Sequence, residues 1–166
     1  MKWVLVLSFV VFSTLQVTWL PHIRPFGVMP DLVLVELATL ALLMGGVAMT
    51  PFAVFGGLLL DLGAGTPLGL SAVALLVALL AIGWWRGIVL YFGVGLYIFA
   101  AAVATVAYDA TILVGMQTLH ERVDWPAAVI EVIGPSVLVN SALAIPLAYL
   151  FGSLARRFGY NAAIQS

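Results

Sequence analysis

The sequence contains no cysteine, and charged side chains make up only 8% of its 166 residues. The absence of cysteine excludes a disulfide framework, an iron–sulfur cluster and a thiolate metal site. Six basic residues against seven acidic ones exclude a basic surface of the kind that binds nucleic acid. The two histidines, His22 and His120, stand far apart and outside any HExxH-type spacing. We therefore expect no metal site and no cofactor.

The usual sequence motifs of enzymes are also missing. The chain has no nucleophile elbow, no P-loop and no histidine–carboxylate pair at a useful spacing. We therefore expect a protein that is not an enzyme, and its function has to be sought in binding or assembly.

Apolar residues, by contrast, dominate the chain. They make up 64% of the sequence, against roughly half in a soluble domain, and the mean hydropathy is +1.22. This composition predicts an all-α integral membrane protein that forms one domain over residues 1–166 in the lipid bilayer. Six apolar segments predict a bundle of six transmembrane helices, at about 3–20, 31–44, 52–62, 68–84, 88–114 and 126–154.

Three of these segments have features of their own. The first, which Trp3 and Trp19 bracket, is too long for a signal peptide and is not followed by an A-x-A cleavage site. We expect it to be retained as a helix with a tryptophan at each membrane interface. The third, residues 52–62, is short, so a re-entrant segment is the alternative to a full crossing. Prolines predict kinks in the last segment, at Gly134-Pro135 and at Pro146.

The distribution of charge predicts the orientation. Six crossings place both termini on one side of the membrane, with four basic residues there and two on the other side. The excess of positive charge places both termini in the cytoplasm. The first group is Lys2, Arg86, Arg156 and Arg157, and the second is Arg24 and Arg122. All seven acidic residues then fall in the outer half, which predicts a polar cluster or an outward-opening cavity there.

Five of the acidic residues lie at or inside the ends of predicted helices. Glu36 and Glu131 stand within apolar runs, where ionisable residues usually mark a functional site. They are expected to line a polar pocket or a surface for another helix. Asp31, Asp61 and Asp109 stand near helix ends, so capping and salt bridges are the alternative for them. Asn140 is expected to be an interhelical hydrogen-bonding residue or a member of the same pocket.

Small residues gather in the fifth segment, which reads AAAVATVA over residues 100–107. In lipid such a surface lets another helix approach closely, which makes Ala102 and Ala104 candidates for contact with a partner. The third and fourth segments are joined by the sequence GLLLDLGAGTPLG, residues 57–69. It places the carboxylate of Asp61 just before a glycine- and proline-rich turn, and predicts a tight hairpin.

This hairpin sequence resembles the G-x-x-L-D-x-x-x-G-x-x-x-G motif of the rod shape-determining protein MreD family. Asp61, Gly65, Pro67 and Gly69 stand in matching places, and Pro30-Asp31-Leu32 also fits. The resemblance extends over nearly the whole chain in length and in its six apolar segments, and a short arginine-rich tail agrees. The fifth and sixth segments match only in hydropathy, so Asp109 and Glu131 inherit no role from it.

The resemblance implies a non-catalytic scaffold of the cell-wall elongation machinery in the bacterial inner membrane, supporting rod shape and peptidoglycan elongation. Its direct partner would be an MreC-like bitopic protein, with the MreB filament, the RodA glycosyltransferase and a class B penicillin-binding protein as indirect partners. The implied fold is similar to the substrate-binding S-components of energy-coupling-factor transporters. The alternative function is a transporter subunit that binds a small cationic solute. The candidates for partner binding or the polar pocket are Asp31, Glu36, Asp61, Pro67, Gly69, Ala102, Ala104, Asp109 and Glu131.

Overall fold

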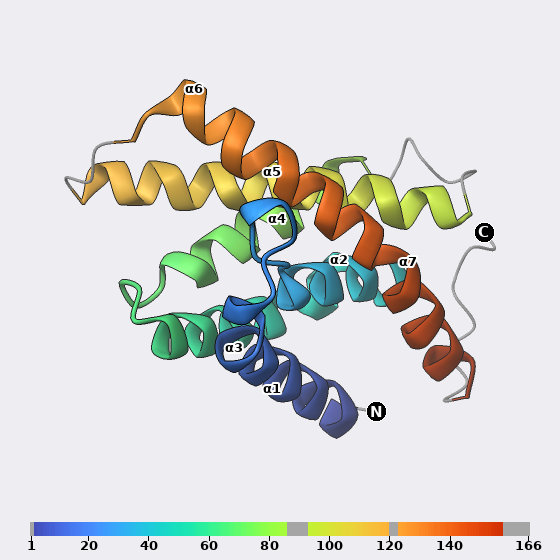
Figure 1. Ribbon diagram of the computed structural model, residues 1–166. Helices are drawn as coiled ribbons and strands as arrows, with labels where there is room; N and C mark the ends of the chain where they lie inside the picture. Colours follow the sequence, from blue (N-terminus) through green and yellow to red (C-terminus); the bar gives the residue numbers. More distant parts are fainter. Residues whose placement is uncertain (1, 86–92, 120–122, 158–166) are drawn as a thin grey trace.

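The computed structural model describes residues 2–85, 93–119 and 123–157, and within these ranges the chain is helical and contains no strand (Figure 1). The α-helices are α1 (Lys2–Thr18), α2 (Leu32–Met44), α3 (Gly46–Ala64), α4 (Leu70–Trp85), α5 (Val94–Thr118), α6 (Trp125–Ala128) and α7 (Gly134–Arg157). Two 3-10 turns, η1 (Leu20–His22) and η2 (Pro25–Gly27), lie between α1 and α2. The predicted helix start at residue 88, together with Arg86, His120, Glu121 and Arg122, lies outside the described residues.

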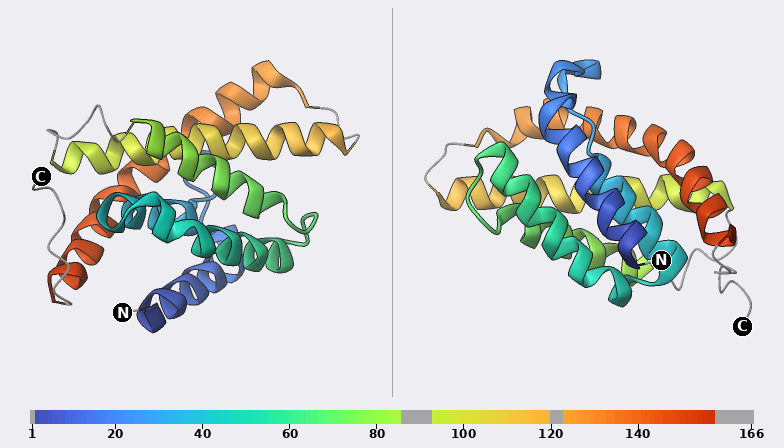
Figure 2. Two further views of the ribbon diagram at one scale, coloured as in Figure 1. Left: turned by 180° about the vertical axis from the view of Figure 1, so that it is seen from behind. Right: turned by 90° about the horizontal axis from the view of Figure 1, so that it is seen from below.

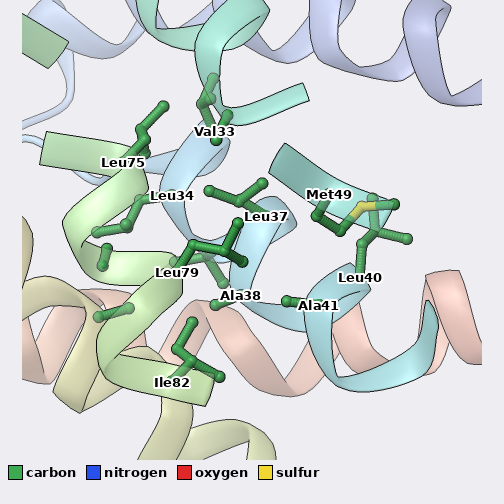
Figure 3. Packing of buried hydrophobic residues seen from close by; sticks show 14 of the residues in the cluster. Val33, Leu34, Leu37, Ala38, Leu40, Ala41, Met49, Leu75, Leu79 and Ile82 are labelled. Atoms are coloured by element: carbon green, nitrogen blue, oxygen red, sulfur yellow. The ribbon is translucent and has the colours of Figure 1, made fainter. Parts of the chain in front are cut away.

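Helix α2 is the centre of the bundle. Its nine consecutive residues from Val33 to Ala41 are all buried, which is expected of a helix that is apolar on every side. It contacts α1, α3, α4, α5 and α7. Figure 3 shows its side chains between Leu75, Leu79 and Ile82 of α4 and Met49 of α3. The other helices are therefore arranged around α2, a short and mostly apolar central helix.

Four helical stretches are long and apolar enough to cross a membrane: Trp3–His22, Gly46–Ala64, Val94–Thr118 and Trp125–Arg157. The helices α2 and α4 are apolar but shorter. The 13 residues of α2 extend over about 20 Å, against a hydrocarbon core of about 30 Å. The structure thus confirms an all-helical chain with four candidate spans, while a crossing by all six helices stays a prediction.

The third helix is longer than the sequence predicted. It begins at Gly46 and passes through Pro51 to Ala64, so it has 19 residues instead of the expected segment 52–62. Residues 45–51 contain two glycines and a proline, which usually interrupt helices, so the expected helix began only after Pro51. In an apolar bundle a proline inside a helix is tolerated, because neighbouring helices and local adjustments compensate for the missing hydrogen bond.

The last segment is one continuous helical stretch with a local irregularity. A π-helical turn, η3 (Val129–Ile133), joins α6 to α7 directly before the predicted kink at Gly134-Pro135. Pro135 has no N–H, and its ring conflicts with the carbonyl group of Glu131 four residues earlier. A wider turn relieves that conflict. Glu131 therefore lies in the one π-helical turn of the described residues.

The helices give the bundle two distinct ends. In Figure 1 the α3–α4 hairpin, the end of α5 and the start of α6 lie on the left, while the start of α1 and the end of α7 lie on the right. The two views of Figure 2 agree with this arrangement. We call the end that holds the α3–α4 hairpin the hairpin end and the other the terminal end. The start of α1 and the end of α7 lie at the same end (Figure 1), as expected when an even number of helical segments alternate in direction.

The small residues of α5 pack inside the chain. Ala104 is completely buried and Ala101 is 1% exposed, and α5 packs against α4 and α7. This corrects the expectation that Ala104 lies on a face free for a partner, because its small side chain already allows helices of the same chain to approach. Ala102 is half-buried and keeps some exposed surface.

Candidate functional site

The α3–α4 hairpin is organised by the carboxylate of Asp61, which is 1% exposed. Its Oδ1 atom accepts hydrogen bonds from the Thr66 hydroxyl group (2.8 Å) and the Ser71 backbone N–H (3.1 Å). Its Oδ2 atom accepts one from the Gly69 backbone N–H (2.7 Å). The carboxylate thus joins the end of α3 to the first turn of α4, where a negative charge is stabilised by the helix dipole. For Asp61 the structure shows the capping role that the sequence left open.

Two glycines of the hairpin have backbone conformations that other residues rarely adopt. Gly65 ends α3 with φ 70°, and Gly69 precedes α4 with φ 94°. Glycine takes such positive φ values without steric cost. Between them, Pro67 lies exposed at the tip, and its carbonyl group accepts a hydrogen bond from the Leu70 N–H (3.1 Å). The hairpin therefore has a specified shape instead of a flexible one.

A network of buried hydrogen bonds holds the start of α2. The Gln16 amide of α1 donates to Asp31 Oδ1 (2.6 Å) and accepts from the Val33 N–H (3.0 Å). The Asn140 side chain of α7 accepts from the Asp31 N–H (2.9 Å) and donates to the Thr105 hydroxyl group of α5 (3.1 Å). Four helices are thus joined through polar side chains. Asn140 is fully buried and has the interhelical role that was one of its two expected roles.

Beside this network lies a cavity of about 590 Å³ at the hairpin end. Its walls come from the end of α1, the segment between α1 and α2, the end of α3, the second half of α5, and η3 with the start of α7. Within the part of the chain that the structure describes, three carboxylic acids line it, Asp31, Asp109 and Glu131, together with one basic residue, Arg24. The structure thus brings together three of the sequence candidates that lie far apart along the chain.

Asp109 stands out among the three acids. It is 8% exposed, and its Oδ2 atom has no hydrogen-bond partner among the described residues. The Ser136 hydroxyl group of α7 faces the same carboxyl group. Glu131 lies exposed on η3, whereas Asp31 is half-buried and already bonded to Gln16. Asp109 is therefore the acid with an unused acceptor in the cavity wall.

Glu36 does not belong to the cavity. It is completely buried in α2, and neither of its carboxyl oxygens has a hydrogen-bond partner in the part of the chain that the structure describes. Ser8 of α1 faces it, but the Ser8 hydroxyl group donates to the Leu5 carbonyl (2.9 Å). The expectation that Glu36 and Glu131 would share one pocket is therefore not met, because α2 carries Glu36 into the bundle core.

Comparison with protein-family models, with curated proteins and with solved structures finds no match to this chain. The resemblance of the hairpin sequence to the MreD family therefore stays a prediction.

Metal binding receives no support from the acids. Across residues 2–85, 93–119 and 123–157, no group of three or more histidine, aspartate or glutamate residues is placed to hold a metal ion. The three carboxyl groups line one cavity without converging on a single point. Their arrangement suits a larger ligand that carries positive charge.

Sequence reasoning missed several residues of the site. Gln16, Tyr108 and Ser136 line the cavity, yet none of them stands out in the sequence except Gln16, an amide within an apolar segment. A polar residue within an apolar segment usually faces the interior of a bundle. The sequence could therefore have indicated Gln16 as a member of the site. Ser136 and Tyr108 carry no comparable signal, because their roles depend on how α5 and α7 pack.

Proposed function

We propose that this chain is a non-catalytic scaffold of the bacterial cell-wall elongation machinery. It would lie in the inner membrane with both termini in the cytoplasm and bind an MreC-like bitopic protein. Through that partner it would act with the MreB filament, the RodA glycosyltransferase and a class B penicillin-binding protein in rod shape and peptidoglycan elongation. The observation that carries the proposal is the hairpin centred on Asp61.

Four of the five marked positions of the hairpin motif have a structural task in the hairpin. Asp61 bonds the first turn of α4, and Gly65 and Gly69 take positive φ values. Gly57 allows α3 and α4 to touch, because a Cβ atom there would lie 2.3 Å from the Ala72 Cα. A resemblance that includes four residues with such tasks is stronger support than a chance match of apolar residues would be, since the four tasks define one shape.

The tip of the hairpin supplies a surface for a partner helix. Leu62 and Leu68 are 69% and 71% exposed, and Ala64 and Pro67 between them are exposed as well. Leucines provide dispersion contacts, and small neighbours let the end of a partner helix approach closely at the membrane interface. Because the Asp61 bonds fix the hairpin, a partner would meet this surface without ordering it first.

The charge distribution supports the orientation. Arg156 and Arg157 lie exposed at the end of α7, at the terminal end. Trp3 and Trp84, both 84% exposed, belong to the start of α1 and the end of α4, and tryptophans of this kind favour a membrane interface. The acid-lined cavity is at the opposite end. Basic residues near helix ends favour the cytoplasm, which leaves the cavity facing outward.

The proposal predicts the outcome of co-purification in mild detergent with an MreC-like protein. We expect the wild-type chain to retain the partner, and Leu68→Ala to lower the retained amount about fivefold, or ~1 kcal/mol. Leu80→Ala on α4 is the matched control, because Leu80 is 74% exposed and lies outside the hairpin. It should retain the partner as the wild type does.

Two results would count against the proposal. Failure of the wild-type chain to retain an MreC-like protein, with an ATPase module or a tightly bound solute in its place, would favour the transporter subunit. An equal loss of partner in Leu68→Ala and Leu80→Ala would remove the hairpin tip as the contact surface. Thermal unfolding of both variants should match the wild type, since both leucines are largely exposed.

A further inference from the structure

We infer that the cavity at the hairpin end binds a ligand that carries an ammonium group, and that the carboxylate of Asp109 holds this group. The site goes beyond the scaffold role and does not depend on it. It is built from several parts of the chain that the fold brings together, and its acids come from the start of α2, from α5 and from η3.

The charge of the cavity wall favours a cation. Among the described residues, three acids and one basic residue line it, and Asp31 and Asp109 are near enough to act on each other electrostatically. Two like charges in a medium of low dielectric constant repel strongly, and a cation between them relieves this repulsion. Arg24, which lies exposed at the rim and donates to the Pro21 carbonyl (3.1 Å), leaves the acids in excess.

The unsatisfied atom of Asp109 indicates where the cation binds. A buried acceptor without a partner is costly, by about 1–3 kcal/mol and more if it is charged. Asp109 is only 8% exposed, and its Oδ2 atom has no hydrogen-bond partner among the described residues. An ammonium group offers three N–H donors. It would bond Oδ2, and its positive charge would also be attracted by Asp31 and Glu131, which line the same cavity.

The size and lining of the cavity indicate the rest of the ligand. Its volume of about 590 Å³ is that of a site for a small organic molecule. Apolar side chains such as Val17, Leu60 and Ile112 form part of the wall. The ligand would therefore combine an ammonium group with apolar atoms. A soluble amine and the headgroup of phosphatidylethanolamine share this chemistry, and Arg24 at the rim would suit the phosphate of the latter.

Two measurements on the full-length protein separate these sources. In nanodiscs, native mass spectrometry compares retention of phosphatidylethanolamine with retention of phosphatidylglycerol. In detergent, thermal unfolding is followed with 1,5-diaminopentane and with uncharged 1,5-pentanediol. Retention of phosphatidylethanolamine alone identifies a lipid headgroup, and stabilisation by the diamine alone identifies a soluble amine. If neither probe is preferred over its uncharged or anionic counterpart, the inference is overturned.

Matched substitutions test the role of Asp109. We expect Asp109→Asn to weaken binding of the preferred probe about tenfold, because one charge-assisted hydrogen bond is lost. Glu36→Gln is the control, since Glu36 is equally an unpartnered buried acid but does not line the cavity. It should change binding less than twofold. Equal binding by Asp109→Asn and the wild type would contradict the assignment.

A third variant covers the case in which Asp109→Asn does not fold. Glu131 is exposed at η3, so Glu131→Gln should fold normally. We expect it to weaken binding of the same probe about threefold, since it removes one of the negative charges without removing the central acceptor. Unchanged binding in Glu131→Gln would then contradict an ammonium site in this cavity.

Discussion

Gly57→Ala is expected to lower the free energy of unfolding by about 3 kcal/mol, at the upper end of the usual cost of overpacking. A Cβ atom at this position would lie 2.3 Å from the Ala72 Cα and 2.4 Å from the Ala72 N. These are backbone atoms of α4, so no side chain can rotate away to make room. The helices α3 and α4 would have to separate, and both the hairpin and the contacts with α2 would be disturbed.

The measurement is thermal unfolding of the purified protein, with an expected decrease in Tm of roughly 8 °C. Gly83→Ala provides the control in the same pair of helices, because a Cβ atom at Gly83 would meet nothing within 4 Å. Alanine favours helix over glycine by up to about 1 kcal/mol, so this variant should match or exceed the wild type. Similar Tm values for the two variants would show that α3 and α4 do not touch at Gly57.

Asp61→Ala is expected to lower the free energy of unfolding by about 3–5 kcal/mol. The substitution removes an acceptor of three hydrogen bonds, and each contributes about 1–1.5 kcal/mol. It also leaves the Ser71 N–H, in a residue that is 5% exposed, without its partner. Asp61→Asn keeps one acceptor oxygen, so its free energy of unfolding should lie between those of Asp61→Ala and the wild type.

Asp124→Ala is the natural comparison, measured by the same unfolding experiment. Asp124 also caps a helix, but it is exposed and accepts one longer hydrogen bond, from the Ala127 N–H (3.4 Å). Loss of an exposed cap costs about 1 kcal/mol or less. If Asp61→Ala were no more destabilising than Asp124→Ala, the carboxylate would not be what holds the hairpin together.

The hairpin was the most predictable part of the molecule. Its glycines, its proline and Asp61 lie within 13 consecutive residues, 57–69, so local chemistry decides its shape. The all-helical fold class was equally predictable, because apolar segments of this length in a membrane form few structures other than helices. The start of α3 was not predictable, because glycines and a proline at residues 45–51 have the same sequence pattern in a turn and inside a membrane helix.

The sequence predicts at which end of the bundle the cavity lies, but it does not predict which residues line the cavity. Alternation of helices places the acids at one end, and this requires only their positions along the chain. Which of them share a wall depends on the packing of α2, which carries Glu36 into the core and leaves Asp31 at the cavity. The burial of Ala104 also depends on helix packing. A row of small residues allows another helix to approach, but it does not show whether that helix belongs to the same chain or to a partner.

The most direct test of this account is site-specific labelling, because the chain contains no cysteine to interfere. Ala64→Cys places one thiol at the exposed hairpin end, and Arg156→Cys places one at the exposed end of α7. With a membrane-impermeant maleimide on intact spheroplasts, we predict labelling of Cys at position 64 and labelling at position 156 only after permeabilisation. Labelling of both positions from the same side, or of position 156 alone from outside, would contradict an outward-facing cavity opposite a cytoplasmic basic end.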